Sequence, residues 1–495
     1  MELALELETA QPESHGLSSG DVLRFMERIE ELELQVNRLM LLQEGRVTAR
    51  FNRQPYRDGA PTLLFSLSKS FTSIAAGIAW DEGYIRLTDP VISYFPDKLT
   101  GNVPPYLSQM TIHHLLSMNT GHHDNIYGRV MNSGPDWATT FLSLKPEHPP
   151  GSHYVYNTHA TYMVAAVLER ATGMSLVEYL KPRLFEPLGV DLVDWETCPM
   201  GVAAGGMGLS IPIDGVAKFG QMLLNEGMYG GRRIVSAEYV RLATSEQSDN
   251  RRNETRADFS EGYGYQFFRC RQGCYMGNGG FGQLCFVAPK HGIVIAAASS
   301  MSHMKKQLPQ LLDLIYEHIV DRVYRSQPIS SEAYPLLLQR IARMQGEAAP
   351  SVPSVPSALP DHWAGRYTVR EPDPNGIAEI RVCRMEERSE LRLHYADCSR
   401  RELPFDLTKM IRTKDIFRKD LSMHRQEAAI SARLTDDLQL ELTVVYIETP
   451  YRVTLTLTFA DGHVELVEEI NVSFDKKTAR VTAMKQEQQA GRSKA

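Results

Sequence analysis

A run rich in proline and serine, at residues 348–360, divides this chain of 495 residues into two parts with different hydrophobic patterns. Prolines recur at every third or fourth position of the run, which favours a stiff, extended linker over a helix or a paired strand. We therefore predict one domain over residues 1–330, a helix and linker over 331–360, and a second domain over 361–480. Residues 481–495, which are mostly polar from Lys485 onward, are expected to be a disordered tail.

The first 330 residues begin and end with hairpin-like patterns and have helical periodicity between them. Strand-length apolar segments flank turn residues at 39–51 and again at 284–298. Residues 64–240 are dominated by apolar positions at helical spacing, and single helices are predicted at 16–32 and 308–319. This order predicts an α+β domain. Its two ends share an antiparallel sheet flanked by helices, and the insert forms a helical lobe.

Beyond the linker, apolar and polar residues alternate in short segments at 438–444, 452–459 and 464–468. Successive side chains of a β-strand point to opposite faces, so this alternation is typical of strands with one buried face. Turn residues such as Asp461 and Gly462 separate the segments. The pattern predicts a small, barrel-like all-β domain, whose role the residues alone do not indicate.

The composition excludes several classes of function. The formal charge of −7 and the lack of basic stripes argue against a nucleic-acid partner. The most hydrophobic stretch, residues 292–298, is too short to cross a bilayer, and the acidic residues 1–6 do not resemble a secretory signal. A cytoplasmic protein without a membrane span is therefore expected, with its six cysteines as free thiols.

No metal or cofactor site is expected from the sequence. Cys270 and Cys274 are close together, but no second pair completes a zinc pattern. Histidines occur at 113–114 and 122–123, next to Asp124, at spacings that match no helical pair of ligands. We therefore interpret these histidines as hydrogen-bonded or solvated side chains.

Ser66-Leu67-Ser68-Lys69 is the motif with the clearest chemistry. It opens a predicted helix over residues 66–79, whose small and apolar residues form one buried stripe. A serine at a helix start lies beside free backbone N–H groups, and Lys69, three positions later, returns to the same side. A serine hydroxyl needs a base. A lysine can serve if burial or positive charge lowers its pKa from about 10.4.

The same spacing of serine and lysine occurs twice more, at residues 302–305 and 473–476. About two chance matches are expected in a chain of ordinary composition and this length. The first lies in a polar turn after a predicted strand, and the second ends a predicted strand near the tail. Neither serine opens a helix with a buried stripe of small residues, so Ser66 is the predicted nucleophile.

The surroundings of Ser66 resemble the serine β-lactamase and penicillin-binding protein family, nearest to its class C and esterase branch. The likeness covers residues 12–325. Beyond the Ser66 motif, its stretches are residues 81–90, 111–121, 149–152, 185–189 and 217–220. The resemblance implies a β-lactamase/transpeptidase-like fold and an acyl-enzyme formed on Ser66, with Lys69 as the residue that activates the hydroxyl.

The family's second motif, Tyr-x-Asn, corresponds to the stretch at residues 154–158. Its distance from the preceding Pro-Gly pair selects Tyr156 as the family's tyrosine, with Tyr154 as the rival. The resemblance implies that the Tyr156 phenol shares the nucleophile's proton with Lys69 and passes it to the leaving group. Thr158 stands where the family has its Asn, which alters the usual contact to a substrate amide.

The family's third motif, Lys-Thr-Gly, is missing. The equivalent stretch is residues 276–283, whose glycines would let a backbone N–H reach the acyl oxygen as half of an oxyanion hole, with the Ser66 N–H as the other half. The candidate oxyanion and substrate-binding residues are Asn278, Gly279, Gly280, Phe281 and Thr158. The missing lysine would grip a substrate carboxylate. Its loss argues against β-lactams and D-Ala-D-Ala peptides as main substrates and favours neutral esters, amides or acyl donors.

The sequence thus predicts a serine hydrolase that forms an acyl-enzyme on Ser66 with small-molecule or peptide esters or amides. Two alternatives stay open. In an acyltransferase, an alcohol or amine would replace water, and in a sensor or penicillin-binding protein the serine would be acylated without turnover. The expected partner is an acyl substrate, and a homodimer is left open.

Overall fold

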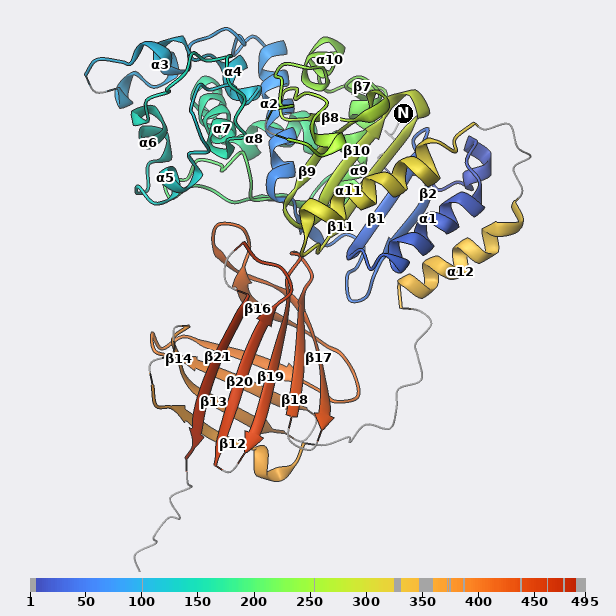
Figure 1. The fold of residues 1–495 in the computed structure, drawn as a ribbon, viewed down its shortest axis with the longest axis vertical. Helices are drawn as coiled ribbons and strands as arrows, with labels where there is room; N and C mark the ends of the chain where they lie inside the picture. Colours follow the sequence, from blue (N-terminus) through green and yellow to red (C-terminus); the bar gives the residue numbers. More distant parts are fainter. Residues whose placement is uncertain are drawn as a thin grey trace, which may run out of the picture. The chain divides into compact units, whose positions relative to one another are not determined.

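The computed structural model divides into two compact units, Met1–Glu347 with Asp420–Ser422, and Ala348–Lys419 with Met423–Ala495. The residues that the structure describes are 6–99, 101–252, 254–324, 331–346, 359–371, 373, 375–385, 388–436, 439–460, 462–474 and 477–486. The first unit combines helices with a sheet, whereas the second is built from strands (Figure 1).

A six-stranded antiparallel sheet forms the base of the first unit, with the strand order β2-β1-β11-β10-β9-β8. Its strands are β1 (Val36–Gln43), β2 (Arg46–Asn52), β8 (Phe268–Arg269), β9 (Tyr275–Gly279), β10 (Gln283–Ala288) and β11 (Ile293–Ser299). β1 pairs with β11, and Leu41 lies opposite Ile295. Both ends of the first unit therefore share one sheet, as the hairpin patterns predict.

Side chains from opposite faces of this sheet belong to two separate hydrophobic clusters. The helices involved are α1 (Ser19–Glu31), α2 (Ser68–Asp81), α9 (Ile213–Leu224) and α11 (Met304–Ile315). Leu39 and Leu41 of β1 share a cluster with α1 and α11, whereas Met40 and Leu42 share the other with α2 and α9. Successive side chains of β1 thus point to opposite faces of the sheet and are buried on both. Because a fully buried leucine stabilises a fold by about 1.5–3 kcal/mol, helices cover both faces.

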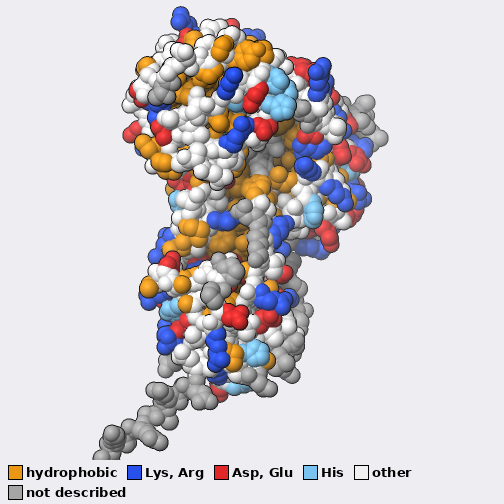
Figure 2. All heavy atoms as spheres, turned by 60° about the vertical axis from the view of Figure 1, so that its left-hand side comes forward, with side chains coloured by type: hydrophobic (Ala, Val, Ile, Leu, Met, Phe, Trp, Pro, Cys, Tyr) orange, Lys and Arg blue, Asp and Glu red, His pale blue; other side chains and the backbone are white. Residues whose placement is uncertain are grey.

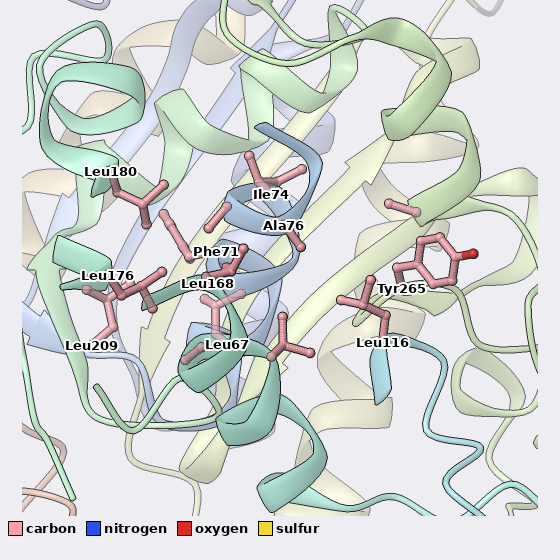
Figure 3. Packing of buried hydrophobic residues seen from close by; sticks show 14 of the residues in the cluster. Leu67, Phe71, Ile74, Ala76, Leu116, Leu168, Leu176, Leu180, Leu209 and Tyr265 are labelled. Atoms are coloured by element: carbon pink, nitrogen blue, oxygen red, sulfur yellow. The ribbon is translucent and has the colours of Figure 1, made fainter. Parts of the chain in front are cut away.

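The insert between β2 and β8 forms the helical lobe around α2. Its other helices include α3 (Pro105–Gln109), α4 (Ile112–Leu116), α5 (Tyr127–Met131), α6 (Trp137–Ser143), α7 (Thr158–Thr172) and α8 (Leu176–Leu180). α2 is buried at every position from residue 68 to residue 79. Phe71 stacks on Phe219 of α9 with ring centroids 3.9 Å apart, and Figure 3 shows Phe71 and Leu168 in the same core. The helix that follows Ser66 is therefore a rigid central element of the unit.

Smaller elements complete the first unit. They are β3 (Pro61–Leu63), β4 (Asp194–Trp195) and β5 (Leu209–Pro212) in a three-stranded sheet, the pair β6 (Met228–Tyr229) and β7 (Arg232–Arg233), and the helices α10 (Ala237–Thr244) and α12 (Tyr334–Met344). The six cysteines are free thiols, as predicted. Within the described ranges, every helix is too short or too polar to traverse a lipid bilayer.

The second unit is a ten-stranded antiparallel sheet with the order β15-β14-β13-β12-β21-β20-β19-β18-β17-β16. Its strands are β12 (Gly365–Val369), β13 (Ile377–Arg384), β14 (Ser389–Tyr395), β15 (Arg400–Phe405), β16 (Ile411–Arg418), β17 (Met423–Asp436), β18 (Gln439–Tyr446), β19 (Arg452–Ala460), β20 (His463–Ile470) and β21 (Thr478–Lys485). Arg401 of β15 forms an ion pair of 2.9 Å with Asp415 of β16, so the two edge strands meet and nearly close a barrel. The predicted barrel-like domain is confirmed.

Two details differ from the sequence predictions. α2 begins at Ser68, and Ser66 lies in a preceding 3-10 turn, because the positive φ of Phe65 interrupts the helical conformation. The prediction of a disordered tail is wrong for residues 481–485, which belong to β21 and pair with β12 and β20. Tail residues 487–495 and linker residues 348–358 lie outside the described part of the chain.

Candidate active site

Ser66 lies just ahead of α2 and Lys69 lies in its first turn, and their side chains face each other. β3 leads into the 3-10 turn Phe65–Leu67, and α2 follows. Lys69 Nζ lies 3.1 Å from Ser66 Oγ. Phe65 has a φ of 48°, a left-handed conformation that costs a non-glycine residue about 1–3 kcal/mol. Its ring packs edge-on against Phe281, with centroids 5.3 Å apart, which holds the turn in place.

The Lys69 side chain is buried, with only 1% of the residue exposed. Its Nζ lies 2.7 Å from the carbonyl oxygen of Gly206 and 3.3 Å from Thr158 Oγ1. Burial disfavours the charged ammonium and lowers the pKa of Lys69 to about 7, although the carboxylate of Asp420 raises it. At neutral pH a substantial share of the amine is therefore uncharged and able to accept the Ser66 proton.

Tyr156 is the tyrosine that lies beside this pair. Lys69 Nζ lies 4.9 Å from the centre of its ring. Burial raises the pKa of Tyr156 to about 12, and a hydrogen bond with Ser66 opposes that rise. Tyr154 instead packs against Tyr263, with ring centroids 5.5 Å apart. The structure thus places the hydroxyl of Tyr156 next to the serine.

Thr158 lies beside Lys69. It is the first residue of α7 and follows the cap residue Asn157, whose side chain accepts a hydrogen bond of 3.1 Å from the N–H of His159. Only 9% of Thr158 is exposed, and its hydroxyl lies 3.3 Å from Lys69 Nζ. The hydroxyl is therefore available to orient the amine, and little of it is left for contact with a substrate.

β9 passes directly against the turn that carries Ser66. A Cβ atom on Gly279 would lie 2.0 Å from the carbonyl oxygen of Leu64, and one on Gly277 would lie 2.4 Å from Ser70 Oγ. Neither position has room for a side chain, so glycine lets the backbone of β9 approach the serine. This close approach is what the predicted oxyanion role of the glycine-rich stretch requires.

The other predicted oxyanion residues lie around the end of β9. Asn278 is half-buried opposite Leu284 of β10, and Gly280 is buried in the 3-10 turn Gly280–Gly282. The N–H of Phe281 donates a hydrogen bond to Met304 Sδ. Because that N–H is directed at sulfur, we do not assign Phe281 to the proposed oxyanion hole.

The comparisons with known proteins identify the family of this chain. The family model described as Beta-lactamase matches residues 35–317, which is more than half of the chain. The chain belongs to the Beta-lactamase family. The 6-aminohexanoate-dimer hydrolase of Paenarthrobacter ureafaciens is 27% identical over 283 residues, covering 53% of this chain and 71% of that protein. A β-lactamase of Escherichia coli K12 is 26% identical over 136 residues, covering 28% of this chain and 35% of that protein.

Solved structures share the fold of this Beta-lactamase-family chain. The octameric penicillin-binding protein homologue from Pyrococcus abyssi has a TM-score of 0.50 and 16% identity, and covers 94% of this chain and 99% of that one. A penicillin-binding protein homologue from Caulobacter crescentus has a TM-score of 0.50 and 16% identity, and covers 63% of this chain and 99% of that one. At these identities the likeness establishes the fold alone, and it confirms the predicted fold class.

Two glycines of this Beta-lactamase-family chain complete the surroundings of Lys69, and the sequence analysis missed both. Thr72 Oγ1 donates to the carbonyl oxygen of Gly205 at 2.8 Å, and Lys69 Nζ contacts that of Gly206. A Cβ on Gly206 would lie 2.6 Å from the carbonyl oxygen of Thr158. The consecutive glycines in the stretch of small residues at 203–206 were the available signal for such a close approach.

Gln266 is a third residue that sequence reasoning missed. It is 2% exposed and has a φ of 66°. Its carbonyl oxygen accepts a bond of 2.9 Å from Ser70 of α2, and its side-chain oxygen accepts one of 2.7 Å from Thr161 of α7. Its side-chain nitrogen donates to the carbonyl oxygen of Leu116 at 2.7 Å. Gln266 therefore ties together the helices that carry Lys69 and Thr158, although no local pattern marks it.

The compact unit that holds the site also contains residues 420–422. The carboxylate of Glu196, 5% exposed, accepts hydrogen bonds of 3.0 Å from the backbone N–H groups of Asp420 and Ser422. Burial raises the pKa of Asp420 to about 7, the charge of Glu196 raises it too, and Lys69 lowers it. The sequence offers no signal for this group, because more than 200 positions separate Asp420 from Glu196.

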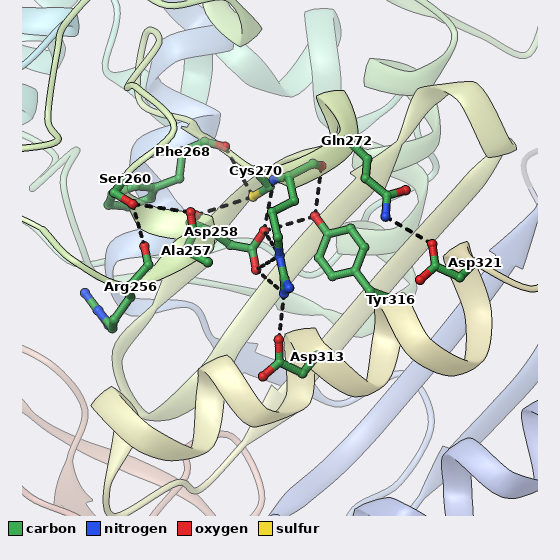
Figure 4. Close-up of polar contacts among 11 residues, drawn as sticks. Arg256, Ala257, Asp258, Ser260, Phe268, Cys270, Gln272, Asp313, Tyr316 and Asp321 are labelled. Atoms are coloured by element: carbon green, nitrogen blue, oxygen red, sulfur yellow. Dashed lines mark hydrogen bonds and ion pairs between the residues drawn. The ribbon is translucent and has the colours of Figure 1, made fainter.

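A polar network outside the site supports the segment that enters β9 (Figure 4). Arg271 contacts Asp258 at 2.8 Å and Asp313 of α11 at 2.7 Å. The hydroxyl of Tyr316 donates to Asp258 at 3.0 Å. Because Asp258 is only 3% exposed, loss of Arg271 would leave a buried carboxylate without its cation. The network thus connects the β8–β9 turn to α11.

Proposed function

We propose that this chain is a serine hydrolase that cleaves esters or amides of small molecules or peptides through an acyl-enzyme on Ser66. The observation that carries the proposal is the buried amine of Lys69, 3.1 Å from Ser66 Oγ. A pKa of about 7 makes this amine a usable base at neutral pH. The relative that is 27% identical is itself named as a hydrolase, which supports the reaction class.

In the first step, Lys69 Nζ accepts the proton of the Ser66 hydroxyl while Ser66 Oγ forms a bond with the acyl carbon of the substrate. The carbonyl electrons move onto the acyl oxygen, and the N–H groups of Ser66 and of the Gly279–Gly280 segment stabilise that negative charge. The bond to the leaving group then breaks and the acyl-enzyme remains. Water attacks its ester carbon as Lys69 accepts one of the water protons, and Lys69 returns that proton to Ser66 Oγ as the acid is released.

Tyr156 donates the proton to the leaving group in this scheme. A pKa of about 12 keeps its phenol protonated at neutral pH, so it serves as a donor and relay rather than as the base. It gives its proton to the leaving oxygen or nitrogen and regains one from protonated Lys69. The sequence predicted that Lys69 and Tyr156 both remove the serine's proton, and we now assign that step to Lys69.

The substrate class follows from what the glycine-rich stretch lacks. Residues 276–283 contain no lysine or arginine, so this stretch offers no cation to a substrate carboxylate. We therefore propose substrates that are neutral near the scissile bond. The name of the 27% identical hydrolase suggests the 6-aminohexanoate dimer as one compound to include in a substrate screen.

The test is a screen of p-nitrophenyl esters of short acids, p-nitroanilides, the 6-aminohexanoate dimer and a chromogenic β-lactam against the wild-type protein and Ser66→Ala. We expect ester or amide turnover by the wild type, loss of that turnover in the variant, and weak or no turnover of the β-lactam. A fluorophosphonate probe should label the wild type alone. Labelling of Ser66→Ala at the same rate would show that another residue is the nucleophile.

The same assay separates hydrolysis from the two alternatives. An acyltransferase would form product only after an alcohol or amine acceptor is added. A protein that is acylated without turnover would release one equivalent of p-nitrophenol and then stop, with the acyl group retained on Ser66 in an intact mass spectrum. We expect a steady phase in water alone. Because the homologue from Pyrococcus abyssi is octameric, light scattering on the same sample is a direct test for an oligomer.

A further inference from the structure

Three histidines gather on the surface of the helical lobe, away from Ser66 in sequence and from different segments of the chain. His123 follows α4, whereas His148 and His153 lie between α6 and α7. One ring nitrogen from each of the three lies within 4.8 Å of the others. Figure 2 shows histidine side chains gathered in a patch on the surface of this unit. Such a group is what a bound transition-metal ion requires.

The backbone holds these histidines in fixed positions. The N–H of His148 donates to the carbonyl oxygen of Gly121 at 2.9 Å, and the N–H of Val155 donates to that of Met118 at 3.0 Å. Gly121 has a φ of 82°, and a Cβ there would lie 2.2 Å from the carbonyl oxygen of His148. Only glycine permits this approach. The two segments are therefore joined on both sides of the cluster before any ligand binds.

The spacing of the ring nitrogens suits a tetrahedral ion. His123 Nδ1 lies 3.2 Å from His148 Nε2. Two nitrogen ligands at 2.0–2.1 Å from tetrahedral zinc lie about 3.3–3.4 Å apart. The rings of His148 and His153 have centroids 4.8 Å apart, so the third histidine lies beside the first two. A proton now shared by two facing nitrogens would be replaced by the metal.

The cluster is accessible to an ion from solvent. His123 is exposed, and His148 and His153 are half-buried, so the cluster is open to solvent. The Glu147 carboxylate accepts a hydrogen bond of 2.9 Å from the backbone N–H of His123, and Asp124 follows His123 in sequence. Asp124 forms an ion pair with Arg129, whereas the Glu147 carboxylate fixes the backbone of the first ligand.

We infer that His123, His148 and His153 form a binding site for a divalent transition-metal ion, with Zn²⁺ the best fit. Three imidazole nitrogens suit zinc, nickel or copper and do not suit magnesium or calcium, which prefer oxygen. Three protein ligands leave the fourth tetrahedral position to water or to an exogenous anion. The site is separate from the proposed nucleophile and base, because none of its ligands contacts Ser66 or Lys69 among the contacts of the described residues.

The histidines named by the sequence analysis have other roles. His113 Nδ1 lies 2.7 Å from the Tyr265 hydroxyl, and His122 Nδ1 lies 2.8 Å from Thr120 Oγ1. These side chains are hydrogen-bonded, as the sequence analysis interpreted them. His123 is the exception, since its ligand partners lie 25 and 30 positions away and no spacing rule could group them.

A bound ion would also act on Tyr156 through the backbone. Val155, whose N–H bonds to Met118, immediately precedes Tyr156. The ion would hold together the two segments that carry its ligands, and one of these segments continues into Tyr156. We therefore expect metal binding to raise the melting temperature of the whole chain, because an ion that binds only the folded state stabilises it.

The test uses the full-length protein after treatment with EDTA and dialysis. Isothermal titration with ZnCl₂ should give one site per chain, and CoCl₂ should give the visible absorption bands of a tetrahedral complex. Loss of a group that only supports a metal ligand weakens metal affinity by about 10–100-fold. Loss of a ligand itself should cost at least as much, so His148→Ala and His153→Ala should each weaken the apparent Zn²⁺ affinity by at least about tenfold. His123→Ala, at an exposed position, should do the same without disturbing the fold.

His291→Ala is the matched control, because it removes one half-exposed histidine from the β10–β11 turn. It should bind Zn²⁺ as the wild type does. The same titration on Ser66→Ala should also match the wild type, so failure of the proposed hydrolase would leave this result unchanged. Equal Zn²⁺ affinity in the wild type and in correctly folded His123→Ala and His148→Ala would overturn the inference, as would the absence of a one-to-one site in the wild type.

Discussion

The Nζ atom of Lys69 lies 2.7 Å from the carbonyl oxygen of Gly206, an acceptor that cannot donate in return. A neutral amine has two N–H bonds and one lone pair. Its N–H bonds are satisfied by Gly206 and by Thr158 Oγ1 at 3.3 Å, which leaves the lone pair for the hydroxyl of Ser66 at 3.1 Å. The acceptors around Lys69 thus orient the uncharged amine for removal of the serine's proton.

This orientation predicts the effect of removing the Thr158 hydroxyl. Thr158→Val keeps the shape of the side chain but leaves one N–H of Lys69 without its acceptor. We expect kcat/KM for a p-nitrophenyl ester to fall about tenfold, in the range of one neutral hydrogen bond, while the melting temperature changes little. Thr172→Val, at the other end of α7, is the control and should keep wild-type activity. An unchanged rate in Thr158→Val would exclude an orienting role for this hydroxyl.

Substitution of the two tyrosines of the second motif should change kcat/KM to very different extents. Tyr156→Phe removes the phenol beside Ser66 and should lower kcat/KM by about 10²–10⁴-fold, the usual contribution of general acid catalysis. Tyr154→Phe removes a phenol that packs near Tyr263 and should keep activity within a few-fold of the wild type. Steady-state kinetics with an ester and an anilide will separate the pair. The reverse order of effects would identify Tyr154 as the proton donor.

The pH profile should reflect the pKa of Lys69. The uncharged amine is the active form, so activity needs a pH above the lowered pKa of about 7. Below that value the ammonium dominates, and kcat/KM should fall about tenfold for each pH unit. Tyr156, with a pKa of about 12, should cause no decline on the alkaline side below pH 10. A rate that stays constant from pH 8 down to pH 5 would show that Lys69 is not the base.

Asp420→Asn should move that acid limb to lower pH. The Asp420 carboxylate favours the charged ammonium and so raises the pKa of Lys69. Asp420 has a pKa of about 7 itself, so its carboxylate is partly ionised at neutral pH, and its removal leaves a larger fraction of the Lys69 amine neutral near pH 7. The measurement is the midpoint of kcat/KM against pH, with Asp191→Asn on an exposed loop as the control. A shift to higher pH in Asp420→Asn would contradict the charge argument.

Gly279→Ala should destabilise the fold as well as the site. The added Cβ would lie 2.0 Å from the carbonyl oxygen of Leu64, so β9 or the turn carrying Ser66 has to move. Overpacking of this kind costs about 1–3 kcal/mol. Urea unfolding should show that loss, together with a lower kcat. Gly128→Ala in α5 has open space around the added methyl group and should be neutral or slightly stabilising.

The helical and strand periodicities predicted the fold well because they are local. Alternation along β18 and β19 and the hairpin patterns at 39–51 and 284–298 correspond to strands of the structure. The exact start of α2 was not predictable, since it depends on the left-handed conformation of Phe65. The prediction of a tail was wrong for residues 481–485, because they adjoin the polar run that starts at Lys485 and their pairing with β12 and β20 is not local.

The candidate site also combines a feature that is local in the sequence with contacts that only the folded chain creates. The sequence alone was sufficient to place Ser66 beside Lys69, because three positions near a helix start bring two side chains to one face. Tertiary structure decided what surrounds the amine, namely Gly206, Asp420 and the phenol of Tyr156. It also grouped His123 with two distant histidines. Contacts of that kind depend on how segments pack across the whole unit, and burial, which lowers the pKa of Lys69, exists only after the chain has folded.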